Sequence, residues 1–501
     1  MRIWLAGFVL LGVLFCSRLT VAEAAERPLH DNFYWLGQIN KASIVINSSE
    51  GLLSPTEAAQ FARGLETVLE NGDEPGAARP NLVITFEPLL IQAAGEEVTK
   101  IHAGRSSQDM LSACSAAEMR ENILDLAEAL DQMSATLVRM AEEQQDTIVP
   151  NYTNGVAAQP NSYGHYLLAY AAGFARDSDR LHEYYQRLNR SPLGTTVLNG
   201  TSWPLNRDRM ADYMGFDGLA YNAYDAVQVY SLENGVEAGY LATSVAIHIG
   251  SFIEDVMQQY AQPRPWILLQ EGGENTYVSS AMPQKRNPGI LNRTRTEAST
   301  ILGDAMGAAL RAHNIPPGMA DARSHELDTM VQRTTGLVRN FDKILKALQI
   351  HPERSLEELN LDWTASQEVA DVLMRQYQIP FRLGHHFASE MVGYARAQGL
   401  TPKTFPYAEA QRIYRETVAG HADAPAELPL SEQAFRDTLD PVAIVRNRAT
   451  KGGPQPAEMA VMLAAARGTL QENAAWARER RARLAAAEKK LDTAFDRLLA
   501  E

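Results

Sequence analysis

The sequence predicts an all-α fold built around a long bundle of helices, and three observations support that prediction. Apolar residues recur at alternating spacings of three and four, which is typical of helices packed against other helices. Residues 119–140 keep this spacing without a break, and residues 167–188 and 337–348 nearly repeat it. Strand signals are few, and the best of them is the short run at residues 81–86. A mostly helical bundle follows.

The N-terminus has the features of an export signal. Arg2 precedes an apolar run at residues 3–16, and Ala22-Glu23-Ala24 offers a small-x-small cleavage site. We expect residues 1–24 to be a signal peptide and the mature protein to be exported, as a periplasmic or secreted protein. An uncleaved membrane anchor is the alternative, although the run is shorter than the roughly 20 residues of a spanning helix. No later stretch is expected to cross a membrane.

Turn-forming stretches divide the remaining chain. Breaks rich in Gly, Pro or Ala lie at residues 72–80, 351–352, 420–429 and 451–454. The predicted units are an N-terminal domain, a central helical-bundle domain, a C-terminal domain and a C-terminal helix, at residues 25–115, 116–350, 351–470 and 471–501. We expect the last helix to lie on the surface or at a subunit contact.

Size and charge limit the classes of function. The chain has 501 residues, of which 45% are hydrophobic, so it can bury a large core. Its formal net charge of −15 argues against nucleic-acid binding, which needs a basic surface. A small anionic substrate stays compatible, because a local pocket can be cationic inside an acidic protein. Nothing indicates a cofactor or a metal site: without the signal segment Cys114 is the only cysteine, and the histidines lack metal-binding spacing.

The most specific stretch is the loop at residues 279–288, which reads Ser-Ser-Ala-Met-Pro-Gln-Lys-Arg-Asn-Pro. The glycines and prolines around it indicate an exposed loop that leads into a helix beginning near Gly289 or Ile290. Clustered Ser, Lys and Asn at a helix entrance fit an anion-binding site. From the residues alone, an ordinary polar loop is an equal alternative.

This loop resembles the signature Ser-Ser-x-Met-Pro-x-Lys-x-Asn-Pro of the fumarase/aspartase superfamily, in the form found in argininosuccinate lyases. The resemblance implies that Ser279 is the catalytic base and that Lys285 and Asn287 bind the substrate carboxylate. Removing a proton beside a carboxylate gives a dianionic intermediate, which needs cationic and hydrogen-bonding donors already in place. A serine becomes a base only where positive charge and exclusion of water stabilise its alkoxide.

Residues 100–109 resemble the first of three family segments along the chain, His-Thr-Gly-Arg-Ser-Arg-Asn-Asp-Gln, and the loop at residues 279–288 is the third. Ser106 and Asp109 match, whereas Ser107 and Gln108 replace an arginine and an asparagine. Ser-Gln-Asp occurs at this place in the related carboxymuconate cycloisomerases, so the segment indicates altered specificity. The resemblance implies that Ser106, Ser107 and Gln108 contact the substrate. From the residues alone, a Ser/Gln loop that caps a helix is the simpler interpretation.

Residues 151–160 resemble the second family segment, Tyr-Thr-His-Leu-Gln-x-Ala-Gln-Pro. Thr153 and Gln159 match and are candidate substrate contacts. Asn154 stands where most members have the histidine associated with proton donation to the leaving group. Asparagine cannot act as a general acid. Aspartases, which also expel an amine, carry glutamine there, so an amine can leave already protonated or take its proton from water. Thr153 and Asn154 are therefore the candidates for the catalytic role of this segment.

The amine half of the implied site departs from the family pattern. Ser43 matches a family serine, but Ile46, Tyr230 and Gly289 replace a histidine, an arginine and an aspartate. Where the family shows a tyrosine, a glutamine and a lysine, the sequence has Met319, Ser324 or His325, and Leu327. The residues implied to bind the fumarate part of the substrate are thus largely kept, whereas those implied to bind the amine part differ from the family pattern.

The resemblance covers about residues 30–470. It implies a three-domain fold that assembles as a homotetramer, with each active site built from three subunits. We expect a carbon–nitrogen lyase that releases fumarate from an N-substituted aspartate, argininosuccinate-like or an aminopolycarboxylate related to ethylenediamine disuccinate. The alternatives are an argininosuccinate lyase proper, and a non-catalytic descendant like some lens crystallins.

Overall fold

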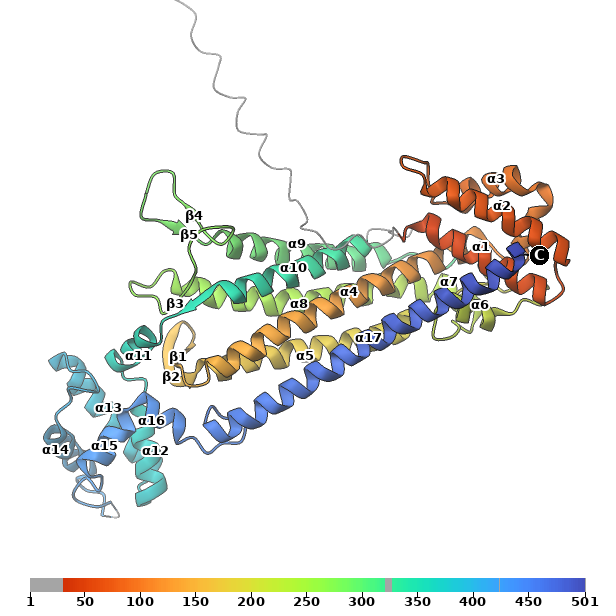
Figure 1. The fold of residues 1–501 in the computed structure, drawn as a ribbon. Helices are drawn as coiled ribbons and strands as arrows, with labels where there is room; N and C mark the ends of the chain where they lie inside the picture. Colours follow the sequence, from red (N-terminus) through yellow and green to blue (C-terminus); the bar gives the residue numbers. More distant parts are fainter. Residues whose placement is uncertain (1–29, 320–326, 423, 501) are drawn as a thin grey trace, which may run out of the picture.

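The computed structural model describes residues 30–319, 327–422 and 424–500. The protein is mostly helical, and its longest helices run side by side along one axis (Figure 1). This confirms the predicted all-α fold with a long central bundle. The predicted signal segment lies outside the described residues.

The N-terminal part consists of short helices at one end of the bundle. They are α1 (Asn32–Ser49), α2 (Pro55–Asp73), α3 (Val83–Ala94) and the 3-10 helix η1 (Glu96–His102). The start of α2 shows how the sequence sets such boundaries: Ser54 and Glu57 form a reciprocal capping box, and Pro55 occupies the first helical position.

The prediction of a strand at residues 81–86 is wrong, because α3 begins at Val83 within this segment. Val83, Phe86, Leu90 and Ala94 are buried, and their spacing of three and four puts them on one helical face. That face packs on α2, where Gly64 leaves room for Ala94. Burial of a helical face therefore outweighs the strand preference of the β-branched residues.

The central part holds five long helices that pack on one another. They are α4 (Ser107–Glu143), α5 (Tyr163–Leu188), α8 (Tyr230–Gln259), α9 (Gly289–Ala312) and α10 (Leu327–Ala347). Shorter elements connect them: β1 (Ile148–Thr153), β2 (Val156–Ser162), α6 (Arg207–Tyr213), α7 (Ala223–Gln228), β3 (Ile267–Leu269), β4 (Tyr277–Val278), β5 (Arg286–Asn287) and β6 (Leu348–Ile350). The strands form three antiparallel pairs: β1 with β2, β3 with β6, and β4 with β5.

The C-terminal part has its own hydrophobic core, built around Trp363, Phe387, Phe405 and Phe435. Its helices are α11 (Pro352–Leu361), α12 (Ser366–Tyr377), α13 (Phe381–Gln398), α14 (Tyr407–Val418), α15 (Glu432–Leu439) and α16 (Pro441–Arg446). The chain then returns along the bundle as α17 (Pro456–Ala500) and ends beside the N-terminal helices (Figure 1).

Two of the predicted domain boundaries fall inside helices. The boundary at residues 115/116 lies within α4, and α1, α2 and α3 share one continuous hydrophobic core with the bundle. The boundary at residues 470/471 lies within α17, because no proline follows Pro456 to end that helix.

One helix contradicts the expectation that no later stretch is long and apolar enough to cross a membrane. α8 meets both criteria by length and composition. Half of its most apolar window is buried inside the protein, where it packs against α9, α5 and α10. Its apolar residues therefore belong in part to the bundle core. A buried core helix can meet the same criteria of length and apolar composition as a membrane-spanning helix.

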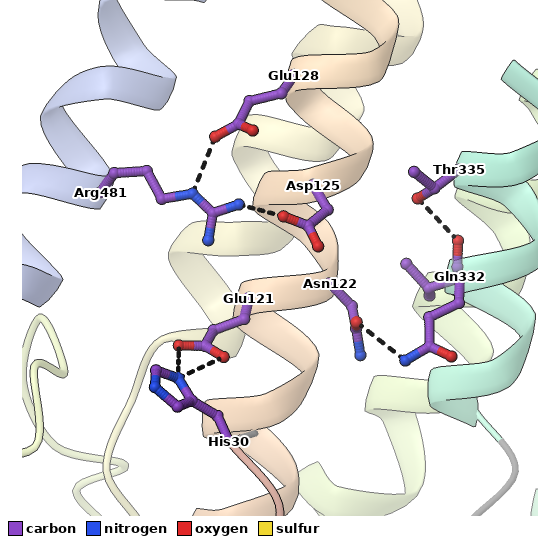
Figure 2. Close-up of polar contacts among 9 residues, drawn as sticks. His30, Glu121, Asn122, Asp125, Glu128, Gln332, Thr335 and Arg481 are labelled. Atoms are coloured by element: carbon purple, nitrogen blue, oxygen red, sulfur yellow. Dashed lines mark hydrogen bonds and ion pairs between the residues drawn. The ribbon is translucent and has the colours of Figure 1, made fainter. Parts of the chain in front are cut away.

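Polar contacts tie α4 to its neighbours (Figure 2). Arg481 of α17 bonds Asp125 and lies 2.9 Å from Glu128 Oε1. Gln332 of α10 donates to Asn122 over 3.3 Å, and His30 Nδ1 lies 2.9 Å from Glu121 Oε1. All four α4 residues lie within two turns, so α17, α10 and the segment before α1 are anchored at one region of α4.

Arg120 lies in the same region but is buried. Its guanidinium donates to Asn189 Oδ1 over 3.0 Å and to the Met214 carbonyl over 2.7 Å. It also lies over the ring of Phe216, 4.7 Å from the centroid. Burial lowers the pKa of this guanidinium. Arg120 therefore joins α4 to the end of α5 and the end of α6 without a salt bridge among the described residues.

We expect Arg120→Ala to lower the free energy of unfolding by about 3 kcal/mol, because it leaves a buried carbonyl and amide without their donor. Arg481→Ala is the matched control on the solvent side, and it should cost about 1 kcal/mol or less. Equilibrium urea unfolding followed by circular dichroism measures both. Equal losses from the two variants would contradict the assigned role of Arg120.

Candidate active site

The first predicted segment forms the start of α4. Ser106 is the N-cap residue: its side chain accepts a hydrogen bond from the Gln108 N–H, and Asp109 accepts one from the Ser106 N–H over 2.8 Å. This is a capping box with aspartate at the third helical position. The helix-capping interpretation of the segment is thereby confirmed. Ser107 and Gln108 follow directly in the first turn and are partly exposed.

Two buried charged residues hold this segment in place. Asp109 is fully buried and also accepts the N–H groups of Thr195 and Thr196, at 3.1 and 3.2 Å. Arg105 is 8% exposed and donates to Asn40 Oδ1 and Ser43 Oγ, at 3.1 and 2.8 Å. Burial lowers the pKa of the Arg105 guanidinium to about 10 and raises that of the Asp109 carboxyl.

Ser43 therefore lies beside the first segment, although it belongs to α1. It is buried and also donates to the Ile39 carbonyl over 2.8 Å. Ser43 and Ile46 line a small cavity with Arg105 and Arg207. Ile46, which replaces the family histidine, thus removes a polar group from this part of the protein. Arg105 was not singled out in the sequence, although the Gly-Arg-Ser pattern contains it.

The second segment is a β-hairpin formed by β1 and β2. Asn154 and Gly155 form its turn, with φ values of 51° and 76°. Two consecutive left-handed residues are typical of a type I′ turn, for which Asn-Gly is the preferred pair. The Asn154-Gly155 dipeptide is a hairpin signal that the sequence interpretation missed. It also gives Asn154 a conformational reason to be asparagine, separate from any role in proton transfer.

The hairpin is anchored against the C-terminal part. Tyr152 donates to Glu358 of α11 over 2.6 Å, and Gln159 donates to Gln367 of α12 over 2.8 Å. Thr153, next to the turn, is exposed. The three predicted residues of this segment therefore lie together at the end of the bundle that faces the C-terminal helices (Figure 1).

The third segment is the loop between β4 and β5. Ser279 Oγ accepts the backbone N–H groups of Ala281 and Met282, at 3.4 and 3.2 Å, and the Ser279 N–H donates to the Lys285 carbonyl. N–H donors aimed at a hydroxyl oxygen favour its charged form, so this turn is suited to stabilise a serine alkoxide. The helix expected after the loop is confirmed as α9, which begins at Gly289.

Of the other two predicted residues of this loop, Lys285 lies just before the return strand β5 and Asn287 lies in it. Lys285 is exposed, and Asn287 in β5 donates to the Tyr277 carbonyl of β4 over 3.3 Å. Figure 1 shows the loop projecting from the body of the protein beyond the start of α9. Within one chain it is open to solvent, so the exclusion of water that the chemistry needs must come from elsewhere.

The three segments do not meet within one chain. α4 separates the first segment from the second, and its 37 residues span about 55 Å at the helical rise of ~1.5 Å per residue. The projecting loop is separate from the β1–β2 hairpin in the same view (Figure 1). A single chain therefore brings together the predicted residues of each segment, but not the segments.

The remaining amine-half positions are scattered. Met319 is exposed, while Ser324 and His325 lie outside the described residues. Tyr230 begins α8, and burial raises its pKa. Across residues 30–319, 327–422 and 424–500, no group of three or more His, Cys, Asp or Glu side chains is arranged to hold a metal ion.

Comparison with known proteins agrees with this arrangement. A family profile described as Lyase matches residues 54–303, and one described as Argininosuccinate lyase C-terminal matches residues 363–446. An argininosuccinate lyase of Methanosarcina acetivorans is 28% identical over 470 residues, covering 92% of this chain and 91% of the relative.

Solved structures extend the likeness to three dimensions. A crystal structure of EDDS lyase in complex with formate has a TM-score of 0.83 and 25% identity, covering 95% of this chain and 97% of the other. An EDDS lyase variant with bound fumarate matches with the same values. The predicted resemblance is thus confirmed, and the chain belongs to the argininosuccinate lyase branch of the fumarase/aspartase superfamily.

Proposed function

We propose that the protein is a carbon–nitrogen lyase that eliminates an amine from an N-substituted aspartate and releases fumarate. The observation that carries this proposal is the Ser279 loop, which keeps every fixed residue of the family signature and aims two N–H groups at Ser279 Oγ. The similarity to argininosuccinate lyases and to EDDS lyase supports the same class of reaction.

The reaction follows from the roles proposed for this loop. Ser279 removes a proton from the carbon beside the distal carboxylate of the aspartate, and Lys285 and Asn287 bind that carboxylate as it gains charge. The electron pair left on the carbon then forms the double bond of fumarate. The C–N bond breaks, and its electron pair leaves with the amine nitrogen, which collects a proton.

The substrate is expected to be an aminopolycarboxylate such as ethylenediamine disuccinate. The altered residues Ile46 and Gly289 and the likeness to EDDS lyase favour it over argininosuccinate. Argininosuccinate stays the second candidate, because the relative of 28% identity carries that name. A non-catalytic protein is disfavoured by the complete set of Ser279, Lys285 and Asn287.

We further propose that a homotetramer completes the site, with Ser106, Ser107, Gln108 and Ser43 from one subunit and the other two segments from its partners. The distance along α4 supports this, since one chain cannot close the site. Exposed apolar side chains on α8 and α9 give partner subunits a surface to bury: Tyr240, Ile247, Met306 and Leu310 are each more than half exposed.

Ser279→Ala should lower kcat by about 10²–10⁴-fold, because it removes the proposed general base. Fumarate absorbance during cleavage of ethylenediamine disuccinate and argininosuccinate measures the rate. Ser280→Ala is the matched control and should keep at least about a tenth of the activity. If Ser279→Ala stayed active and Ser280→Ala were inactive, the base would be Ser280 and not Ser279. If the wild-type protein released no fumarate from either substrate, the result would favour the non-catalytic alternative.

Mixing inactive variants tests the shared site. Ser279→Ala and Gln108→Ala, unfolded and refolded together, should regain up to about a quarter of wild-type activity, since random tetramers contain some sites with both segments intact. Ser279→Ala mixed with Lys285→Ala should gain none, because both changes lie in one segment. Equal outcomes for the two mixtures would overturn the proposal that subunits share the site.

We propose that the protein is exported, with residues 1–24 removed as a signal peptide. The apolar run and the small-x-small motif support this. Mass spectrometry of the protein from cell fractions should find it in the periplasm or medium with a mature N-terminus near Ala25. An intact Met1 on protein from the cytoplasm would contradict export, and an intact Met1 on membrane-bound protein would identify an anchor.

A further inference from the structure

A cavity of about 330 Å³ lies beside the β1–β2 hairpin, between the hairpin, α5, α8 and the start of β3. Its lining includes Thr153, which the proposed function places in the catalytic segment. Its size falls within the range of small-molecule sites. The cavity therefore adjoins the proposed reaction site from within the same subunit, and none of the proposed catalytic steps uses it.

The wall of this cavity is aromatic. Tyr152, Tyr163, Tyr166 and Trp266 all line it. Tyr163 and Tyr166 stack with centroids 5.5 Å apart, and Trp266 meets Tyr163 edge-on at 5.6 Å. Aromatic rings attract cations through the negative charge of their faces, and tryptophan does so most strongly.

Asp255 supplies a carboxylate to the same cavity. Its Oδ2 accepts the Tyr166 hydroxyl over 2.6 Å, and no Lys, Arg or His among the described residues forms an ion pair with it. Its neighbour Glu254, by contrast, pairs with Arg295 at 3.0 Å. The pKa of Tyr166 is raised by burial and by Asp255, so Tyr166 stays a neutral donor. Asp255 therefore offers the cavity a carboxylate that forms no ion pair with a side-chain cation among the described residues.

A buried polar group nearby also lacks a partner. Tyr163 is 2% exposed, and its hydroxyl makes no hydrogen bond in the described structure. That oxygen has almost no accessible surface, so Tyr163 contributes its ring rather than its hydroxyl to the cavity wall. Gln259, which also lines the cavity, adds a second polar side chain beside the aromatic wall.

We propose that this cavity binds a small organic ammonium ion. Aromatic faces and one carboxylate are the combination that recognises an alkylammonium. A site of this kind favours the protonated form of an amine over the neutral form.

Calorimetric titration of the full-length protein with ethylenediamine and with tetramethylammonium tests the cavity without fumarate present. Both cations should bind, and ethylene glycol, the neutral counterpart of the diamine, should not. Asp255→Asn should weaken binding of both cations at least about tenfold, since Asp255 is the only charged residue in the lining among the described residues. Glu254→Gln is the matched control: it makes the same charge change one residue away and should stay within about twofold of wild type.

A folding defect is separable from loss of the site. Asparagine has the shape of aspartate and still accepts the Tyr166 hydroxyl, so a thermal melt of Asp255→Asn should match wild type. Tyr166→Phe, which keeps the ring and the carboxylate, should retain cation binding. The proposal is overturned if the wild-type protein binds neither cation, which is the result expected if a partner subunit fills the cavity. It is also overturned if Asp255→Asn binds the cations as well as wild type does. Cation binding without any fumarate release would overturn the proposed reaction and leave the ammonium site standing.

Discussion

The length of α4 sets the distance between two segments of the proposed active site. The helix begins in the first site segment and ends just before the β1–β2 hairpin, so it holds the two at opposite ends of the bundle. Along the bundle, α4 packs against α5, α10 and α17. In the proposed tetramer the two segments would therefore come from different chains, and the exposed apolar faces of α8 and α9 would provide the contact surface.

The start of α4 is fixed more firmly than helix capping alone requires. Asp109 caps the helix and also holds the backbone at Thr195 and Thr196, while Arg105 reaches Asn40 and Ser43 in α1. Three parts of the chain are thus joined by buried polar contacts at one point. These contacts hold Ser106 and its neighbours in place relative to α1 and to the backbone at residues 195–196.

The Ser279 loop and the cavity beside the hairpin differ in the contacts that shape them. The Ser279 loop depends on local contacts: a pair of short strands and N–H groups that donate to a side-chain oxygen. The cavity depends on residues far apart in the sequence, from Tyr152 to Trp266. Substitutions around the cavity can therefore change what it binds without altering the local contacts of the loop.

The sequence by itself determined the helical bundle, the family and the local form of two segments. The spacing of apolar residues, the Ser106–Asp109 capping box and the helix after Pro288 all depend on neighbours within a few residues. The prediction from sequence was wrong at residues 83–94, which form a helix because their buried face packs on α2. It also missed the hairpin turn at Asn154-Gly155. Only the tertiary structure showed that Ser43 lies beside Arg105, that Asp255 faces an aromatic cavity, and that α4 keeps the site segments apart. These facts depend on contacts between residues tens to hundreds of positions apart, which spacing along a sequence does not encode.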